Sequence, residues 1–217
     1  MKKQEDYIAN IKDAERRFYN DVPELRAVEN SDKKAIRGLG IVYNSLSENF
    51  APWMQGGMYE IIEPGAARGL LNNEDIMILF NHDPNLVLAR NMNTAQLVET
   101  DAGVEYIYDT PNTTVGNDLQ ENIRLKNVRK SSFAFKAKEV RNEVTPWAGL
   151  GKINLRRIVK FEEFYDFSPV TYPAYADTTV AQRSLKEFVE AEENQAKAYL
   201  VDVMRRKHEI YKMSLTR

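Results

Sequence analysis

The chain has 217 residues, of which 43% are hydrophobic, with 30 Lys and Arg, 32 Asp and Glu, two His and no Cys. This length suits one compact domain, or one domain with added helices. The absence of cysteine excludes disulfides, thiolate metal sites and a cysteine nucleophile. The balanced charge indicates no basic surface for nucleic acid. No apolar stretch approaches the ~18 residues that span a bilayer, and no signal peptide is visible, so we expect an intracellular protein without membrane or nucleic-acid partners.

The N-terminal part predicts a helix over residues 4–18, where apolar residues recur at helical spacing. Short apolar or alternating segments follow and predict extended structure, with few helices between them. The extended segments are 35–43, 58–62, 75–80, 86–90, 95–99, 104–108, 131–140, 153–161 and 165–170, with a helical turn over 66–71 and a helix over 117–125, capped by Asn117 or Asp118. This order favours a barrel or a sandwich over a sheet of βαβ units, and therefore a mainly β fold with flanking helices.

Beyond residue 182 the composition changes. Residues 183–217 contain neither Gly nor Pro and carry apolar side chains near a helical period, which predicts one long amphipathic helix or two. We therefore divide the chain into an N-terminal helix (1–20), a β domain (21–182) and a C-terminal helical segment (183–217). The apolar face of that segment needs a covering surface, which could be a second copy of the chain, a partner helix or its own domain.

The segment 128–135 carries the candidate nucleophile. In a strand, alternate side chains face opposite ways, so Phe133 and Phe135 share one face while Ser132 and Ala134 share the other. The two phenylalanines mark the core side. Ser132 is therefore expected to point outward beside a small residue, which leaves room for a substrate chain. A nucleophilic serine also needs a base within hydrogen-bond reach, and without one the same pattern describes an ordinary serine on a strand.

His82 is the candidate base. It follows the apolar segment 75–80, at the point where a strand meets a loop, and catalytic groups often lie at such points. An imidazole titrates near neutral pH and can accept a hydroxyl proton. A turn built with Asp83 and Pro84 explains the same histidine equally well. The other histidine, His208, lies among charged residues of the C-terminal segment and is expected to be exposed.

Asp166 is the candidate third group, which would orient the imidazole and stabilise its cation. It is a lone acid between aromatic residues, and a carboxylate in such surroundings is costly unless it is paired. A backbone amide or an arginine could be its partner instead. Glu162 and Glu163, in a more polar stretch, compete for the same role.

In this order and spacing, the segments resemble the prohead serine proteases of tailed phages, a family related in fold to the herpesvirus assemblins. The resemblance runs from about residue 37 to residue 178. No single segment is specific, but the ordered set is. The segments are 63–66, 79–83, 89–90, 113–118, 132–135 and 166–175.

The resemblance implies a closed or partly closed assemblin-like β-barrel with N- and C-terminal helices. It implies Ser132 as nucleophile and His82 as general base, with Asp166 as the third member where the family usually has glutamate. It also implies that Arg156 and Arg157 lie near the oxyanion site.

The implied activity is that of a serine endopeptidase that cleaves capsid assembly proteins, and itself, during maturation of the phage prohead. The implied partners are the major capsid protein and the scaffold. Self-association through residues 183–217 is a separate expectation, from the apolar face of that segment. The implied setting is the immature capsid in the cytoplasm of a bacterial host, and no cofactor is implied.

Two other functions stay open from the sequence. One is a non-catalytic assembly protein on the same barrel, because alanine replaces the usual family glycine at Ala89 and Ala134. The other is a small-molecule-binding barrel unrelated to capsids, which would leave the ordered motifs unexplained. Labelling by a fluorophosphonate separates the enzyme from both.

Overall fold

The computed structural model describes residues 14–18, 26–30, 33–72 and 75–172, together with Lys197 and Arg205 alone further on. The chain divides into two units, Met1–Asp177 and Thr178–Arg217. The predicted C-terminal helix lies outside the described residues, apart from Lys197 and Arg205, which are both helical. Within the described ranges, no helix is long and apolar enough to cross a membrane.

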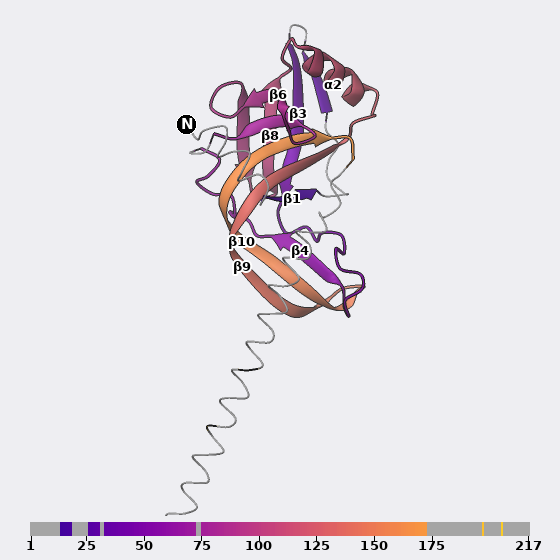
Figure 1. Ribbon diagram of the computed structural model, residues 1–217, viewed down its shortest axis with the longest axis vertical. Coiled ribbons are helices and arrows are strands. Elements are labelled where there is room, and N and C mark those ends of the chain that lie inside the picture. The colour runs from indigo at the N-terminus through magenta and orange to yellow at the C-terminus, as the bar shows by residue number, and fades with distance from the viewer. Residues whose placement is uncertain are drawn as a thin grey trace, which may run out of the picture. The chain divides into compact units, whose positions relative to one another are not determined.

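Six strands form the larger sheet (Figure 1). The order along it is β1-β9-β10-β5-β6, and β4 pairs with another part of β10. The strands are β1 (Glu15–Phe18), β4 (Met58–Ile62), β5 (Met77–Phe80), β6 (Asp83–Arg90), β9 (Lys130–Trp147) and β10 (Gly151–Val170). Pairing of β10 is antiparallel with β9 and parallel with β4 and β5.

β9 and β10 form one long curved hairpin of 18 and 20 residues (Figure 1). The predicted segments 153–161 and 165–170 are parts of the single strand β10. Register shifts between 158 and 166 keep the two parts paired to β9, so the break in the sequence pattern marks bulges and not a loop. The hairpin thus links two parts of the larger sheet, because β10 pairs with β4 near one end and with β5 near the other.

The smaller sheet has four strands in the order β2-β3-β8-β7. They are β2 (Arg26–Asn30), β3 (Lys33–Val42), β7 (Ala95–Thr100) and β8 (Gly103–Asp109). The helix α2 (Thr114–Arg124) follows β8. It begins three residues before the predicted start, and the predicted cap at Asn117 or Asp118 is wrong, because the hydroxyl of Thr113 accepts the amide N–H of Gly116.

A cluster of aromatic rings forms the core between the two sheets. Phe133, Phe164 and Phe167 lie in it with ring centroids 4.6–6.5 Å apart, and Tyr106 of β8 contacts Phe167 at 5.5 Å. Gly40 of β3 faces the Phe167 ring, and a Cβ at this position would lie 2.1 Å from it. Only a glycine allows the strand to approach the ring so closely.

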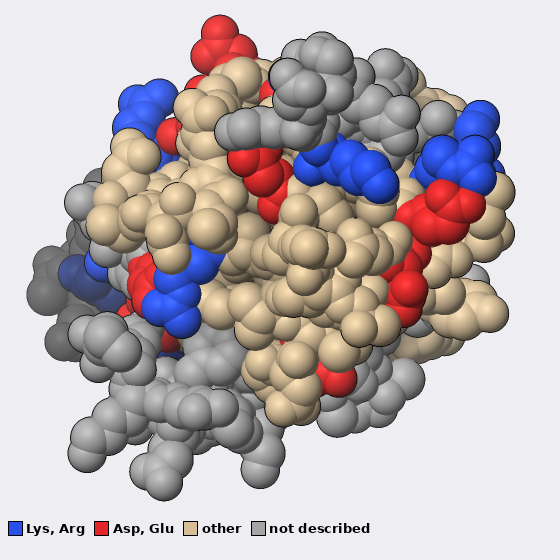
Figure 2. All heavy atoms as spheres, turned by 90° about the horizontal axis from the view of Figure 1, so that it is seen from above, with Lys and Arg blue, Asp and Glu red and all other residues tan. Residues whose placement is uncertain are grey.

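Charged side chains on the face shown in Figure 2 are of mixed sign, with Lys and Arg beside Asp and Glu. Exposed ion pairs include Arg90 with Asp75 at 2.6 Å and Arg124 with Glu121 at 2.5 Å. Such exposed pairs contribute little to stability, about 0–1 kcal/mol each.

The mainly β fold expected from the sequence is confirmed, while closure of the barrel stays a prediction. Two local predictions are wrong. Residues 15–18 form strand β1 and not the end of a helix, and residues 66–71 form turns and not a helical turn. The rest of the predicted N-terminal helix, residues 4–13, lies outside the described residues.

Candidate active site

Three residues from distant parts of the chain form one hydrogen-bonded chain. The Oγ of Ser132 lies 2.7 Å from His82 Nε2, and His82 Nδ1 lies 2.6 Å from Asp166 Oδ1. All three side chains are buried, with exposed fractions of 0% for Ser132, 8% for His82 and 0% for Asp166. A hydroxyl, an imidazole and a carboxylate in this order match the arrangement that activates a serine nucleophile.

The register of the long hairpin places two of these groups side by side. Ser132 on β9 pairs with Ser168 on β10, and the next β9 residue on that face, Ala134, pairs with Asp166. Paired residues in an antiparallel ladder share a face, so the hydroxyl of Ser132 and the carboxylate of Asp166 lie on the same side of the sheet.

His82 reaches the same face from the tight turn between β5 and β6. Asn81 and His82 both have left-handed backbone conformations, with φ of 55° and 57°. Such a conformation is uncommon for residues with a Cβ and needs support from the surroundings. Here the Asn81 amide N–H donates to the carbonyl of Pro169, and the Asn81 side chain accepts the amide N–H of Thr171. The turn is therefore fastened to the end of β10, beside Asp166.

Ser168 is a fourth member of the site that sequence reasoning missed. Its hydroxyl donates to Asp166 Oδ1 at 2.6 Å and accepts the backbone N–H of His82 at 3.3 Å. It holds both the carboxylate and the turn that carries the imidazole. Its position two residues after Asp166 on one strand is the signal that could have found it, because such residues share a face.

The predicted faces of β9 are correct, but the predicted exposure of Ser132 is wrong. Phe133 and Phe135 lie in the core, as alternation requires. Ser132 and Ala134 have no exposed surface either. Ala14 and Tyr165 pack on Ala134, so the face that should be open is covered.

The two competing acids bind other groups. The Glu162 carboxylate pairs with Lys136 at 2.7 Å, and the Glu163 carboxylate accepts the hydroxyl of Tyr165 at 2.5 Å. Asp166 is the acid that contacts the imidazole. His208 lies outside the described residues.

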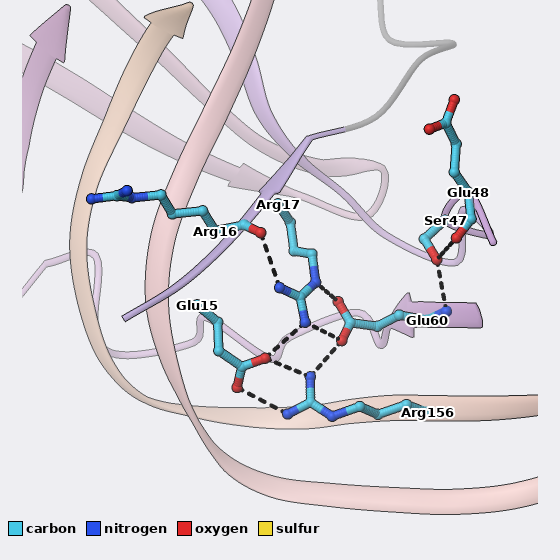
Figure 3. A network of polar contacts seen from close by, with 7 residues as sticks. All are labelled: Glu15, Arg16, Arg17, Ser47, Glu48, Glu60 and Arg156. Atoms are coloured by element: carbon cyan, nitrogen blue, oxygen red, sulfur yellow. Dashed lines mark hydrogen bonds and ion pairs between the residues drawn. The ribbon is translucent and has the colours of Figure 1, made fainter. Parts of the chain in front are cut away.

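Both arginines expected near the oxyanion site have carboxylate partners, and Figure 3 shows those of Arg156. The guanidinium of Arg156 binds Glu15 at 2.8 and 2.9 Å and also contacts Glu60. Arg157 binds Glu143 at 2.5 Å. Burial alone would lower the pKa of Arg156, but the charges of Glu60 and Glu15 outweigh it and raise the pKa.

The geometry places a serine, a histidine and an aspartate in one buried hydrogen-bonded site. Comparison with known proteins identifies the family of the chain. The chain matches the sequence model of the caudovirus prohead serine proteases over residues 22–192. The chain therefore belongs to the caudovirus prohead serine protease family, and the resemblance drawn from its motifs is confirmed. A similar solved structure is the bacteriophage T4 capsid assembly protease gp21, at 10% identity over 70% of this chain and 95% of that chain, with a TM-score of 0.35. No curated protein matches the chain.

Proposed function

We propose that this chain is an endopeptidase of prohead maturation in which Ser132, His82 and Asp166 act as one catalytic unit. The observation that carries the proposal is the unbroken hydrogen-bonded chain from the Ser132 hydroxyl through both ring nitrogens of His82 to the Asp166 carboxylate. Membership of a serine protease family supports the same reading.

In the proposed reaction, Ser132 Oγ attacks the carbonyl carbon of the scissile peptide bond. His82 Nε2 takes the hydroxyl proton, and Asp166 accepts the Nδ1–H and stabilises the imidazolium. His82 then gives its proton to the leaving amine as the C–N bond breaks. Water, activated by the same imidazole, releases the acyl group from Ser132 and restores the hydroxyl.

The proposed substrates are capsid assembly proteins, namely a scaffold or a scaffold-like segment of the major capsid protein, together with the chain itself. The proposed setting is the immature capsid in the bacterial host. Both follow from the family and not from the geometry of the site. The oxyanion role of Arg156 and Arg157 stays a prediction.

The test is a pair of serine variants. Alternation places Ser131 and Ser132 on opposite faces of β9, and Ser131 contacts the Tyr106 hydroxyl at 2.9 Å instead of His82. Ser132→Ala should abolish both fluorophosphonate labelling and cleavage of the major capsid protein of the same phage, while Ser131→Ala should keep most of both.

Labelling and cleavage by Ser132→Ala at the wild-type rates would overturn the nucleophile assignment. Absence of cleavage and labelling in the wild type, and also in a chain in which Arg17→Gln weakens the strand beside Ser132, would favour the non-catalytic assembly protein.

A further inference from the structure

Strand β1 lies on the edge of β9 directly beside the proposed nucleophile. Its register pairs Glu15 with Phe135, Arg17 with Phe133 and Phe18 with Ser132. His82 and Asp166 approach Ser132 from the opposite flank, across β10. The flank on which β1 lies is therefore the one along which a substrate could add to the sheet.

A protease must hold the scissile bond in an extended conformation beside its nucleophile. An exposed strand edge does this by main-chain pairing, as in recognition by strand addition. β1 makes that pairing now: residues 15–18 run antiparallel to residues 132–135. Ala14, just before β1, packs on Ala134, and Ser132 has no exposed surface. While β1 stays in place, no other peptide can pair with this edge.

Two side chains of β1 and two of the body hold the strand through a buried ion quartet (Figure 3). Arg17 binds Glu60 of β4 at 2.6 and 2.9 Å. Glu15 binds Arg156 of β10 through both carboxylate oxygens at 2.8 and 2.9 Å. The bidentate geometry gives specificity as well as strength, because a carboxylate fits the planar guanidinium in one orientation.

The quartet also consists of two halves that are each neutral. Glu15 and Arg17 of β1 contact one another at 2.7 Å, and Glu60 and Arg156 of the body contact one another as well. Removing one partner of a buried ion pair is strongly destabilising because it leaves an unpaired charge. Departure of β1 leaves no such charge, since each half keeps its own counterion. This arrangement suits a strand that must be released and replaced.

We propose that the β9 edge, together with the Arg156–Glu60 pair, is a binding site for an extended peptide carrying an acidic residue and, two residues later, a basic one. Residues 15–18 are the occupant of this site within the chain, and they must leave before another peptide reaches Ser132. The inference rests on the proposed role of Ser132 for its catalytic consequence, but the binding site can be tested without any chemistry.

The binding test uses a fluorescein-labelled synthetic peptide with the sequence of residues 12–20, followed by fluorescence anisotropy. The full chain carrying Arg17→Gln has a weakened β1 and an intact receptor pair, so it should bind the peptide at least tenfold more tightly than the wild type. The same substitution in an exposed pair, Arg37→Gln, is the matched control and should change nothing, because Arg37 and Glu105 lie on β3 and β8 of the smaller sheet.

A peptide with glutamine in place of its acid should bind at least tenfold more weakly to the Arg17→Gln chain. Equal binding by the Arg17→Gln and wild-type chains, or equal binding of the two peptides, would overturn the proposal.

A second experiment fixes β1 in place. Arg16 and Ala134 are directly paired across the two strands, at a separation of about 4.5–5.5 Å between Cα atoms that a disulfide can span. The chain has no other cysteine, so Arg16→Cys with Ala134→Cys can form a single bond. The labelling rate of Ser132 follows the fraction of molecules in which β1 has left. Oxidation should therefore reduce fluorophosphonate labelling at least tenfold, and dithiothreitol should restore it to the rate of Ala134→Cys alone.

The outcomes separate the two proposals. Equal labelling of the oxidised and reduced double variants at Ser132 would overturn the occluding role of β1 while leaving the nucleophile assignment intact. Labelling that persists in Ser132→Ala would overturn the nucleophile, whereas peptide binding to the Arg17→Gln chain would still support the binding site.

Discussion

Replacing Ser168 with alanine should disturb the site more than its small volume suggests. Asp166 Oδ1 accepts hydrogen bonds from both Ser168 Oγ and His82 Nδ1, and no described group donates to Oδ2. A hydrogen bond to a charged group contributes about 1.5–3 kcal/mol, and the weaker bond from the His82 N–H would also be lost. We therefore expect Ser168→Ala to lower the free energy of unfolding by roughly 2–4 kcal/mol.

The matched control is Ser131→Ala, the same change on the neighbouring strand. Its hydroxyl contacts the neutral hydroxyl of Tyr106, so the expected loss is about 0.5–1.5 kcal/mol. Urea denaturation followed by circular dichroism measures both losses by linear extrapolation.

The catalytic consequence needs its own measurement, because stability alone does not show that Ser168 positions the site. Without Ser168, the Asp166 carboxylate keeps one bond and can rotate away from the imidazole. In the Arg17→Gln background, we expect Ser168→Ala to slow fluorophosphonate labelling of Ser132 about 10- to 100-fold, within the range that orientation by the triad acid supplies. Ser168→Thr, which keeps the hydroxyl, should recover most of the rate. Equal stability losses at positions 131 and 168, with unchanged labelling, would refute the positioning role.

Three further predictions follow from the same geometry. His82→Ala and Ser132→Ala should each abolish cleavage, and the double variant should be little worse, because residues that act as a unit give non-additive losses in rate. A rate loss in the double variant equal to the product of the two single losses would show that the two residues act independently. Gly40→Ala should cost about 1–3 kcal/mol in urea denaturation, because the new methyl would lie 2.1 Å from the Phe167 ring, and unchanged stability would show that the ring has room. Burial alone would raise the pKa of Glu15, but Arg17 and Arg156 lower it below its ordinary value of 4.5. The stabilisation of β1 by the Glu15 carboxylate is therefore fully present above pH 4.5 and is lost as pH falls through the lowered pKa. Protection of the β1 amides from hydrogen exchange should therefore fall as pH drops below 4.5, and Glu15→Gln should remove this pH dependence.

Alternation along a strand was sufficient to separate Ser132 from Phe133, since that rule depends only on local backbone geometry. It predicted nothing about what covers this face of β9, because Ala14, which packs on Ala134, is far away in the sequence. The same limit explains β1. Its four residues fit helical spacing with those before them, but pairing with the edge of β9 determines their conformation.

The sequence named Asp166 as the acid beside the imidazole but left Glu162 and Glu163 as competitors, for a related reason. Strict alternation would put Phe164 and Asp166 on one face of β10, with the carboxylate in the core. The structure pairs Phe164 with Phe135 and Asp166 with Ala134, so Tyr165 is an extra residue on β10 at this point. Such a bulge re-aims the side chains that follow it.

The bulge allows one strand to place aromatic side chains in the core and an acidic side chain on the other face. Phe164 and Phe167 both stay in the core although they are three residues apart. Asp166 is then free to lie on the outer face, where it contacts His82 and Ser168. A short carboxylate suffices because the strand itself brings Asp166 to the imidazole. The aromatic run around Asp166, which from the sequence indicates only a costly buried charge, therefore builds both the core and the site from one irregular strand.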